Sequence, residues 1–453
     1  MSEEVSGSSS KPDELEPLRS SVLGVSEYSR RIKLHNELHA RPHELLKAPM
    51  HVSQLALLSA SDVVVDELRL IAQLCERYGV NLPPVDARHF SVQFGSFRLK
   101  WERHTEFSMY TFFIKMPFEV PFAETAIKYV PQEWLASLPG EVIAATHLAI
   151  EHKSRPQRTL EELSALFASN TVIGAKVVAG SAIVWTDNKI HVDGFARILI
   201  HDVDLRRRQA GRLVQRLLEI ETYRMLALIP VSTARQYLPE LARFDRQLAE
   251  LTNNNCGFQS HDNEQKLLDD LTHLAAEIER ISAQTNQRFN ASAAYYNIVK
   301  MRIAELREQR IQGLQMFHEF MEQRLSPAMA TCESVNCNLE LLSTRVARAS
   351  ALLRTRVDIT MEGQTRDLLA SMDKRAKLQL RMQETVEGLS VVVLSYYLLS
   401  ITAYALKALK SSGFPINVEI ATGIAIPIVL GIVFVAVRKV RQIATRDELG
   451  LNG

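Results

Sequence analysis

Short runs of alternating apolar and polar positions dominate the first part of the chain and predict strands with helices between them. One helix is expected between Asp62, its N-cap, and Gly79, which lies just past its end. Residues 89–115 alternate and are rich in aromatic and β-branched side chains, a composition typical of antiparallel strands. The mixture predicts an α/β or α+β domain over residues 27–204.

Helical periodicity replaces the strand pattern after Asp204, which is the expected N-cap of a helix that ends before Pro230. One face of this helix is apolar, and we expect the charged residues of its other face to be solvated and paired with one another. Further helices are predicted over residues 232–252, 262–286 and 290–324, within a helical domain of residues 205–326. The charged residues of the first helix are Arg212, Arg216, Glu219, Glu221 and Arg224.

A single long stalk helix is predicted over residues 327–388. Its apolar stripe runs from Leu339 to Val386, 47 residues in 13 steps, or about 3.6 residues per step, which is the period of a straight helix. Two polar residues, Gln364 and Gln379, interrupt the stripe. A stripe of this length requires cover, either from the preceding helices or from another subunit.

Two apolar runs near the C-terminus predict a transmembrane hairpin over residues 389–437. Residues 389–409 contain one charged residue, Lys407, and residues 418–437 contain one, Glu419. As a helix, each run is long enough to cross a bilayer core of about 30 Å. A pair of buried core helices is the alternative interpretation.

Basic residues near the ends of the two runs predict that both termini are cytoplasmic. Four precede the first run and four follow the second, whereas two lie at the connection between them. Because basic residues are retained on the cytoplasmic side, this bias predicts a multi-pass protein of the inner membrane with its soluble domain and a basic tail, residues 438–453, in the cytoplasm. The residues are Lys374, Arg375, Lys377, Arg381, Arg438, Lys439, Arg441 and Arg446, against Lys407 and Lys410.

Each membrane run also carries one face of residues that suit packing between membrane helices. Hydroxyl side chains recur at every fourth position of the first run, and small residues and a proline recur at the same spacing in the second. Helix packing is the favoured interpretation, and a pore lining is the alternative. The residues are Tyr396, Ser400 and Tyr404, followed by Gly423, Pro427 and Gly431.

Composition narrows the class of protein only a little. Among 453 residues, 53 lysines and arginines balance 52 aspartates and glutamates, so no global basic charge points to nucleic acid. Four scattered cysteines form neither a disulfide framework nor a zinc ribbon, which fits a reduced compartment. Residues 1–26 are polar, lack the apolar core of a signal peptide and predict a disordered tail.

The stretch HNELH carries the candidate metal ligands. His35 and His39 are four residues apart and would share one face of a helix, as in zinc-binding motifs. Those motifs carry their general base directly after the first histidine, where this chain has Asn36, and no third ligand is evident nearby. We therefore expect His35, Glu37 and His39 to be structural, at the end of an amphipathic helix, with a metal site as the alternative.

Signatures of catalysis are absent from the sequence, which has no phosphate-binding loop, no dinucleotide-binding motif and no nucleophile elbow. No catalytic residue or cofactor can therefore be named. Four aspartates, Asp187, Asp193, Asp202 and Asp204, lie around two turns. Asp204 is the expected helix cap, and turn formation is the favoured role of the others, with a cation site as the alternative.

Four stretches in order carry a resemblance to a known family. They are RIKLHNELHARP (31–42), WERHTEFSMYTF (101–112), VWTDNKIHVDGFARILI (184–200) and AGRLVQRLLEIETYRMLAL (210–228). Followed by the hydrophobic hairpin, they resemble a family of uncharacterised bacterial membrane-anchored proteins, a domain of unknown function that covers nearly the whole chain. The resemblance implies a membrane anchor and brings no activity and no catalytic residues.

A looser similarity concerns architecture alone. A mixed α/β domain, a long helix and two C-terminal spans are similar in layout to the CorA class of magnesium channels, which implies a homo-oligomer. The Gly-Met-Asn signature of that class is absent, because residues 413–417 are Gly-Phe-Pro-Ile-Asn.

Together the patterns predict a membrane-anchored, cytoplasm-facing homo-oligomer that acts as a scaffold or regulatory protein. Its expected partners are the lipid bilayer and further copies of the chain, and nucleic acid is not expected. The alternatives are a CorA-like ion channel or transporter and, with least support, a membrane-bound enzyme that uses His35, Glu37 and His39.

Overall fold

The structure is a computed structural model, and it describes two compact units of the chain. Unit 1 comprises residues 1–257 and 269–348, and unit 2 comprises residues 258–268 and 349–453. Within these ranges, the described residues are 28–31, 34–35, 43–59, 63–84, 87–254, 261–411 and 417–449.

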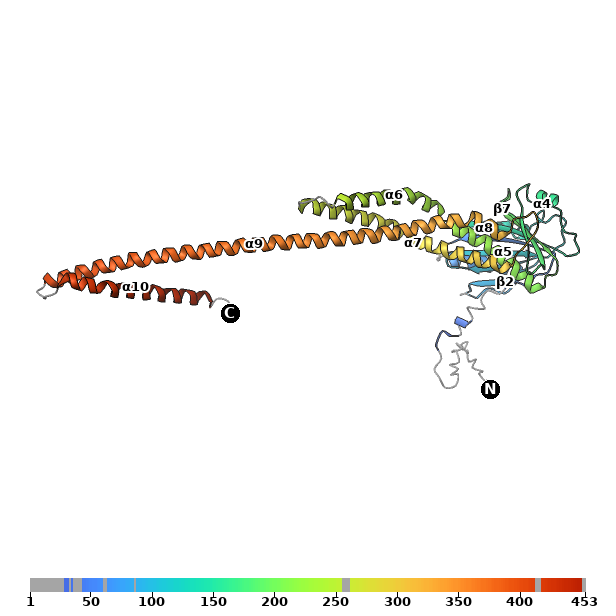
Figure 1. Ribbon diagram of the computed structural model, residues 1–453. Coiled ribbons are helices and arrows are strands. Elements are labelled where there is room, and N and C mark those ends of the chain that lie inside the picture. The colour runs from blue at the N-terminus through green and yellow to red at the C-terminus, as the bar shows by residue number, and fades with distance from the viewer. Residues whose placement is uncertain are drawn as a thin grey trace, which may run out of the picture. The chain divides into compact units, whose positions relative to one another are not determined.

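A nine-stranded mixed sheet forms the centre of unit 1 (Figure 1) and confirms the mixed domain predicted from the sequence. The strand order is β2-β3-β4-β1-β5-β8-β7-β6-β9. Neighbouring strands are antiparallel except for β5 and β8, which are parallel. The strands are β1 (Met50–Leu58), β2 (His89–Phe94), β3 (Phe97–Arg103), β4 (Phe107–Ile114), β5 (Glu141–Glu151), β6 (Ile173–Val177), β7 (Ala182–Ile190), β8 (Ala196–Asp202) and β9 (Gln309–Arg310).

The helices occupy the rest of both units. A long helical region follows the sheet, and an apolar helix lies near the C-terminus, as the sequence predicted. The helices are α2 (Val64–Tyr78), η2 (Ala126–Tyr129), α3 (Gln132–Ala136), α4 (Leu160–Leu166), α5 (Arg207–Leu228), α6 (Val231–Asn254), α7 (His261–Leu306), α8 (Phe317–Arg324), α9 (Ser326–Ser411) and α10 (Val418–Leu449).

Two halves of the sheet repeat one order of elements. In the first half, β1 and α2 are followed by β2, β3 and β4, and in the second, β5 and α4 are followed by β6, β7 and β8. The last strand of each half returns beside the first strand, which gives the orders β2-β3-β4-β1 and β5-β8-β7-β6. The return is antiparallel in the first half and parallel in the second, so the parallel pair lies next to the junction of the halves.

Short helices cover one face of the sheet. Ile71 of α2 and Trp134 of α3 pack with the aromatic side chains of β3 and β4, and Leu163 of α4 packs against Trp185 of β7. The sequence expectation for the end of α2 is confirmed, because Gly79 caps it in a left-handed conformation with φ 65°. The expected N-cap, Asp62, lies outside the described residues.

Helix α5 covers the opposite face of the sheet and is itself covered by α7. Thr222 of α5 donates a hydrogen bond to Gln54 of β1, at 3.1 Å. On the outer side, Arg302 of α7 forms an ion pair with Glu219 of α5. The prediction of a solvated charged face is therefore wrong for Glu219 and Glu221, which are 8% and 4% exposed. The charges are paired, but inside the protein.

The start of α5 also differs from the expectation. The N-cap residue is Arg206 rather than Asp204, and Gln209 accepts the backbone N–H of Arg206 at 3.0 Å. Asp202 accepts the N–H of Leu205 at 2.7 Å and so fixes the turn that precedes the helix. The helix begins later than expected because an aspartate at the end of β8 orders this turn.

The two helices expected over residues 262–286 and 290–324 are replaced by a different arrangement. Helix α7 is continuous over 46 residues, and it is followed by β9 and the short helix α8. Strand β9 pairs with β6 at one edge of the sheet. The polar loop between α7 and α8 thus adds a strand to the sheet.

Unit 2 consists of helix, with little cover for its apolar residues. Helix α9 is continuous over 86 residues, and α10 runs back along its end (Figure 1). Leu353 is 1% exposed, near the pair formed by Arg356 with Glu264 at the start of α7. Farther along α9, Leu368 and Met382 are 63% and 70% exposed.

Candidate functional site

The hairpin between β7 and β8 brings together several of the polar residues of the VWTDNKIHVDGF stretch. The pairing of β7 with β8 shifts register between Thr186 and Ile190, which is a β-bulge. Within it, Asn188 has a φ of 51°, a left-handed conformation that asparagine tolerates better than most residues. The Thr186 hydroxyl donates to the Arg197 carbonyl at 2.7 Å and accepts the Asn188 N–H at 3.2 Å. The bulge is thereby held in place and turns Asp187 into the protein.

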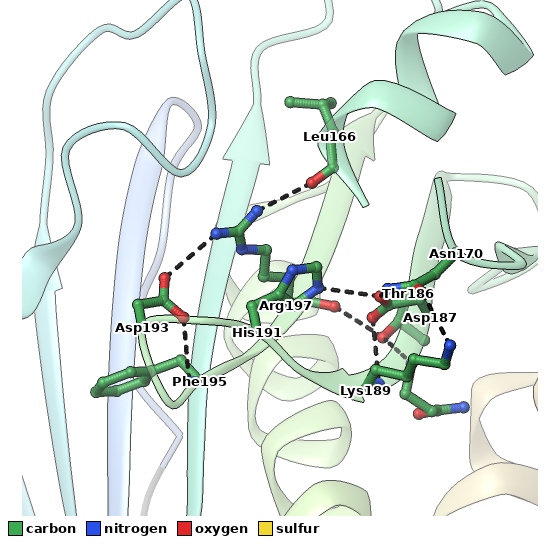
Figure 2. Close-up of polar contacts among 10 residues, drawn as sticks. Leu166, Asn170, Thr186, Asp187, Lys189, His191, Asp193, Phe195 and Arg197 are labelled. Atoms are coloured by element: carbon green, nitrogen blue, oxygen red, sulfur yellow. Dashed lines mark hydrogen bonds and ion pairs between the residues drawn. The ribbon is translucent and has the colours of Figure 1, made fainter. Parts of the chain in front are cut away.

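Asp187 is the centre of a buried polar cluster, which Figure 2 shows. Its carboxylate accepts the Asn170 side-chain amide at 2.8 Å and the Lys189 backbone N–H at 3.2 Å, and it pairs with His191 Nε2 at 3.0 Å. The side chains of Asp187 and His191 are 0% and 4% exposed. The Lys189 ammonium in turn donates to Asn170 Oδ1 at 2.8 Å. Every contact of the carboxylate therefore belongs to the hairpin or to Asn170 before β6.

Asp193 and Arg197 form the other end of this cluster (Figure 2). Asp193 accepts the Phe195 N–H at 3.2 Å and an Arg197 guanidinium N–H at 3.3 Å. Burial alone would raise the pKa of Asp193, but these two hydrogen bonds and the charge of Arg197 outweigh it and lower the pKa. Arg197 also donates to the Leu166 carbonyl at 3.1 Å and lies over the Phe122 ring at 5.3 Å.

A histidine lies beside Arg197 on the same face of the sheet. His147 of β5 is in register with Arg197 of β8 and with Ser53 of β1. The Ser53 hydroxyl is 2.9 Å from His147 Nδ1, and the His147 ring stacks on Phe195 at a centroid distance of 3.8 Å. Burial lowers the pKa of His147 to about 4, so the ring is neutral at pH 7.

Ser53, His147 and Asp193 are the residue types of a hydrolase catalytic triad, but their contacts differ from those of a nucleophilic site. Ser53 has no exposed surface and accepts the Ile127 N–H at 3.2 Å, so substrate has no access to its hydroxyl. The Asp193 carboxylate bonds Phe195 and Arg197 rather than the histidine ring. The three residues stabilise the junction of the two halves of the sheet.

A second cluster lies at the carboxyl ends of the parallel strands, where α/β sheets commonly bind ligands. Glu151 ends β5, and its carboxylate is 2.7 Å from Arg158 and 3.6 Å from Arg155, both from the loop after β5. His201 of β8 lies 3.9 Å from the same carboxylate. Burial would raise the pKa of Glu151, but the hydrogen bond from Arg158 and the charges of Arg158 and Arg155 lower it. The chain's own arginines therefore pair with Oε1 of this carboxylate.

The stretch that carries the alternative metal ligands lies mostly outside the described residues, so its expected structural role stays a prediction. His35 is exposed in a short helical stretch, and His39 and Glu37 lie outside the described residues. Among the described residues, no group of three or more histidines, cysteines and acids has the arrangement of a metal site. Asp187, Asp193 and Asp202 have the turn and hairpin roles described above.

The faces expected to pack in the membrane are largely exposed within a single chain. Tyr396 and Tyr404 are 70% and 73% exposed, and nothing lies within 4 Å of a Cβ built on Gly423 or Gly431. The Ser400 hydroxyl donates to the Tyr396 carbonyl of its own helix at 2.9 Å. Among the described residues of the two apolar runs, those that are buried are Ser395, Val429 and Val433. Packing through the two predicted faces remains a prediction about contacts between chains.

By length and composition, α9 and α10 are both able to cross a membrane. Residues 26–444 match the family model described as a protein of unknown function, DUF3422. The chain belongs to this family. The DUF3422 match confirms the resemblance carried by the four ordered stretches, and it assigns no activity to them. No curated protein and no solved structure matches the chain, so the CorA similarity gains no support.

The sequence did not reveal how Asp187 is used. Its pairing with His191 depends on the bulge, and alternation along β7 gives no sign of one. An aspartate and a histidine four residues apart in a strand, followed by Asp-Gly, are the only local signal. The burial of Glu219 on α5 has even less of a local signal, because its partner Arg302 lies 83 residues later on α7.

Proposed function

We propose that this DUF3422 protein is a membrane-anchored homo-oligomer that holds its mixed α/β unit in the cytoplasm as a scaffold or regulatory protein. The observation that supports it is the apolar stripe of α9. Leu368 and Met372 on this stripe are 63% and 59% exposed, although they lie in a regular helix with an apolar period. A second copy of the same helix would cover them.

The energetic argument concerns residues 357–386 of α9. This segment is about 45 Å long at 1.5 Å per residue. Apolar surface left in water forgoes roughly 25 cal/mol for each Å² that could be buried. An isolated helix also has no tertiary contacts to stabilise it. Association of the stripe with another copy supplies both burial and helix stability.

The membrane anchor rests on the two apolar helices and on their flanking charges. Side chains such as Val392 and Ile428, which are 63% and 56% exposed, would lie in water if the helices were not in lipid. Basic residues flank the helices mainly on the side of the two chain ends, which favours cytoplasmic termini. Lipid and self-association together account for the exposed apolar surface of unit 2.

A scaffold or regulatory role is favoured over catalysis by the chemistry of unit 1. The carboxylates of its two polar clusters have partners from the chain itself, as in Glu151 with Arg158 and Asp187 with Asn170. A catalytic site needs polar groups that converge on space for a substrate. The carboxylates of Asp187 and Asp193 are both bonded within the protein, to Asn170 and to Arg197.

Cross-linking tests the self-association. Single cysteines placed at Met372 or Ala376, in a background without the four native cysteines, are expected to give covalent dimers in native membranes. A cysteine at Lys374, on another face of the helix, is the matched control and should cross-link less. Native mass spectrometry in mild detergent should show an oligomer. A monomer without cross-links would contradict the proposal.

Reporter fusions test the topology separately. A reporter active only in the cytoplasm should be active at either terminus and inactive when inserted after Ser411. Activity of a periplasmic reporter at the C-terminus would contradict a hairpin with both ends inside.

A further inference from the structure

A cleft of about 470 Å³ lies in unit 1 between the end of α7, the short helix α8 and the start of α9. Its volume is within the range of small-molecule sites. A second cleft of about 390 Å³ adjoins it and shares Tyr296, Lys300 and Ser326 with it. Neither cleft includes the hairpin clusters described above.

One wall of the first cleft is apolar. Val299 and Ile303 of α7 and Met321 of α8 line it with side chains that are 1%, 7% and 5% exposed. Ala304 and Met316 continue this wall. Because Val299, Ile303 and Met321 are already covered, a ligand in the cleft would bury its apolar body against Ala304 and Met316.

One lining carboxylate has a free bonding position. Glu308 follows α7, and its Oε2 accepts the backbone N–H of His318 at 3.2 Å in the first turn of α8. Its other oxygen, Oε1, is buried and has no hydrogen-bond partner among the described residues. A buried carboxylate oxygen without a donor is costly, because it has lost water without replacement. The site lacks a donor at this position.

The other charged groups of the lining are already engaged. The Lys300 ammonium lies over the ring of Tyr296, 4.6 Å from its centroid. His318 Nε2 is 3.5 Å from the Glu322 carboxylate. Among the lining residues, Glu308 is the acid that no lysine, arginine or histidine side chain pairs with. Its missing donor would be matched best by a cation.

We propose that this cleft binds a small organic amine, with the ammonium group pairing with Glu308 once its side chain turns Oε1 toward the cleft, and with an apolar body against Ala304 and Met316. The ammonium supplies the donor and the charge that Glu308 lacks, and the apolar part of the ligand fills the wall. The site is separate from the self-association proposed for α9, so either proposal stands if the other fails.

Binding to this site depends on pH through Glu308. Burial raises the pKa of Glu308, with the charge of Glu319 acting in the same direction. The ammonium pairs with the ionised carboxylate, so affinity is highest at neutral pH and falls as acid protonates Glu308. A ligand held by a protonated histidine would show the opposite pH dependence, with an affinity that falls as the pH rises.

Fluorescence titration of the full chain in nanodiscs of neutral phosphatidylcholine tests the proposal, with dansylcadaverine as the amine probe. Wild-type protein should bind it saturably, and Glu308→Gln should weaken binding at least tenfold. The glutamine keeps an oxygen that accepts the His318 N–H, so the start of α8 is preserved. Glu322→Gln, at the rim of the same cleft, is the matched control and should change the affinity less than twofold.

The N-acetylated probe, which has no ammonium, gives a test that does not depend on any variant folding. It should bind wild-type protein at least tenfold more weakly than the amine. Saturable binding that is equal for both probes would overturn the proposal, and so would binding that Glu308→Gln leaves unchanged. Absence of saturable binding by the wild-type chain would also overturn it.

Discussion

The sheet of unit 1 and the exposed length of α9 in unit 2 differ in how far their apolar side chains are covered. In unit 1, large apolar residues such as Trp101 and Trp185 are covered by helices from the same chain. In unit 2, Leu368 and Met382 are more than 60% exposed in a helix of equal regularity. Unit 1 therefore has a core of its own, whereas the apolar surface of unit 2 is left uncovered and would be buried by the proposed bilayer and second chain.

Charged residues show the same contrast. Glu67 and Arg103 of unit 1 form a pair at 3.4 Å with side chains 0% and 5% exposed. Glu362 and Arg366 of α9 form a pair at 3.2 Å with side chains 73% and 80% exposed. A pair in water contributes little, while a buried pair leaves a costly charge when one partner is removed. The contrast predicts that removing a buried charge of unit 1 lowers the unfolding free energy more than removing an exposed charge of α9.

The largest effect is expected from Glu67→Gln. It leaves Arg103 buried without its counter-charge, which costs about 3–5 kcal/mol of unfolding free energy. Ser108 donates to the Glu67 carboxylate at 2.8 Å, and the glutamine oxygen retains part of that contact. Urea unfolding followed by tryptophan fluorescence measures the loss, because the tryptophans lie in unit 1. Glu362→Gln is the control and should leave the urea midpoint unchanged; equal effects of the two substitutions would contradict the contrast.

A smaller effect is expected from acid, through His147. Burial lowers the pKa of His147 from 6.5 to about 4. Between these values the unfolded chain binds more protons than the folded one, so this contribution is complete above pH 6.5 and is lost as the pH falls toward 4. From pH 7 to pH 5 the loss is about 2 kcal/mol. His147→Gln should flatten this part of the pH dependence in urea unfolding, and an unchanged slope would show that His147 is not its source.

The features that could be predicted from the sequence are those that depend on residues close together in the chain. Alternation in residues 89–115 depends on neighbours in the chain, and the expected strands are present as β2, β3 and β4. Gly79 ends α2 as expected because a left-handed C-terminal residue is a local requirement. The stripe of α9 is likewise local, and its helix is continuous.

The features that could not be predicted depend on distant partners. Glu219 is buried because Arg302, 83 residues later, pairs with it, and the charge pattern of α5 alone resembles a solvated face. The pairing of Asp187 with Asn170 requires the register shift of β7, which alternation does not reveal. The cleft beside Glu308 depends on the turn through β9 that places α8 against α7.

The stripe of α9 offers a test of intermediate size. Leu368→Ala should weaken self-association about tenfold, equivalent to about 1.4 kcal/mol, because it removes apolar area from the proposed contact. Leu369→Ala removes the same side chain from a neighbouring position off the stripe, where the leucine is 60% exposed, and should have little effect. Analytical ultracentrifugation in detergent measures both. Urea unfolding of unit 1 should be unchanged in both variants.

The smallest effect on self-association is expected from the two glutamines of the stripe. Val346, Val357 and Leu368 recur every eleven residues on α9, so a dimer shifted by eleven residues would still oppose apolar side chains. Gln364 and Gln379 break this equivalence, because parallel helices in register place each glutamine beside its own copy, where the amides can bond. The polar pairs would therefore set the register at a small cost in stability.

Replacing both glutamines, as Gln364→Leu with Gln379→Leu, should strengthen association slightly and loosen its register. The readout is a cross-link between one chain with Met361→Cys and another with Met372→Cys, positions that meet only in the shifted dimer. This mixed cross-link should be absent in the parent and present in the leucine variant. Cross-linking of Met372→Cys with itself serves as the control for in-register dimers. A mixed cross-link of equal yield in the parent would show that the glutamines do not set the register, and that the exposed stripe of unit 2 specifies association without specifying alignment.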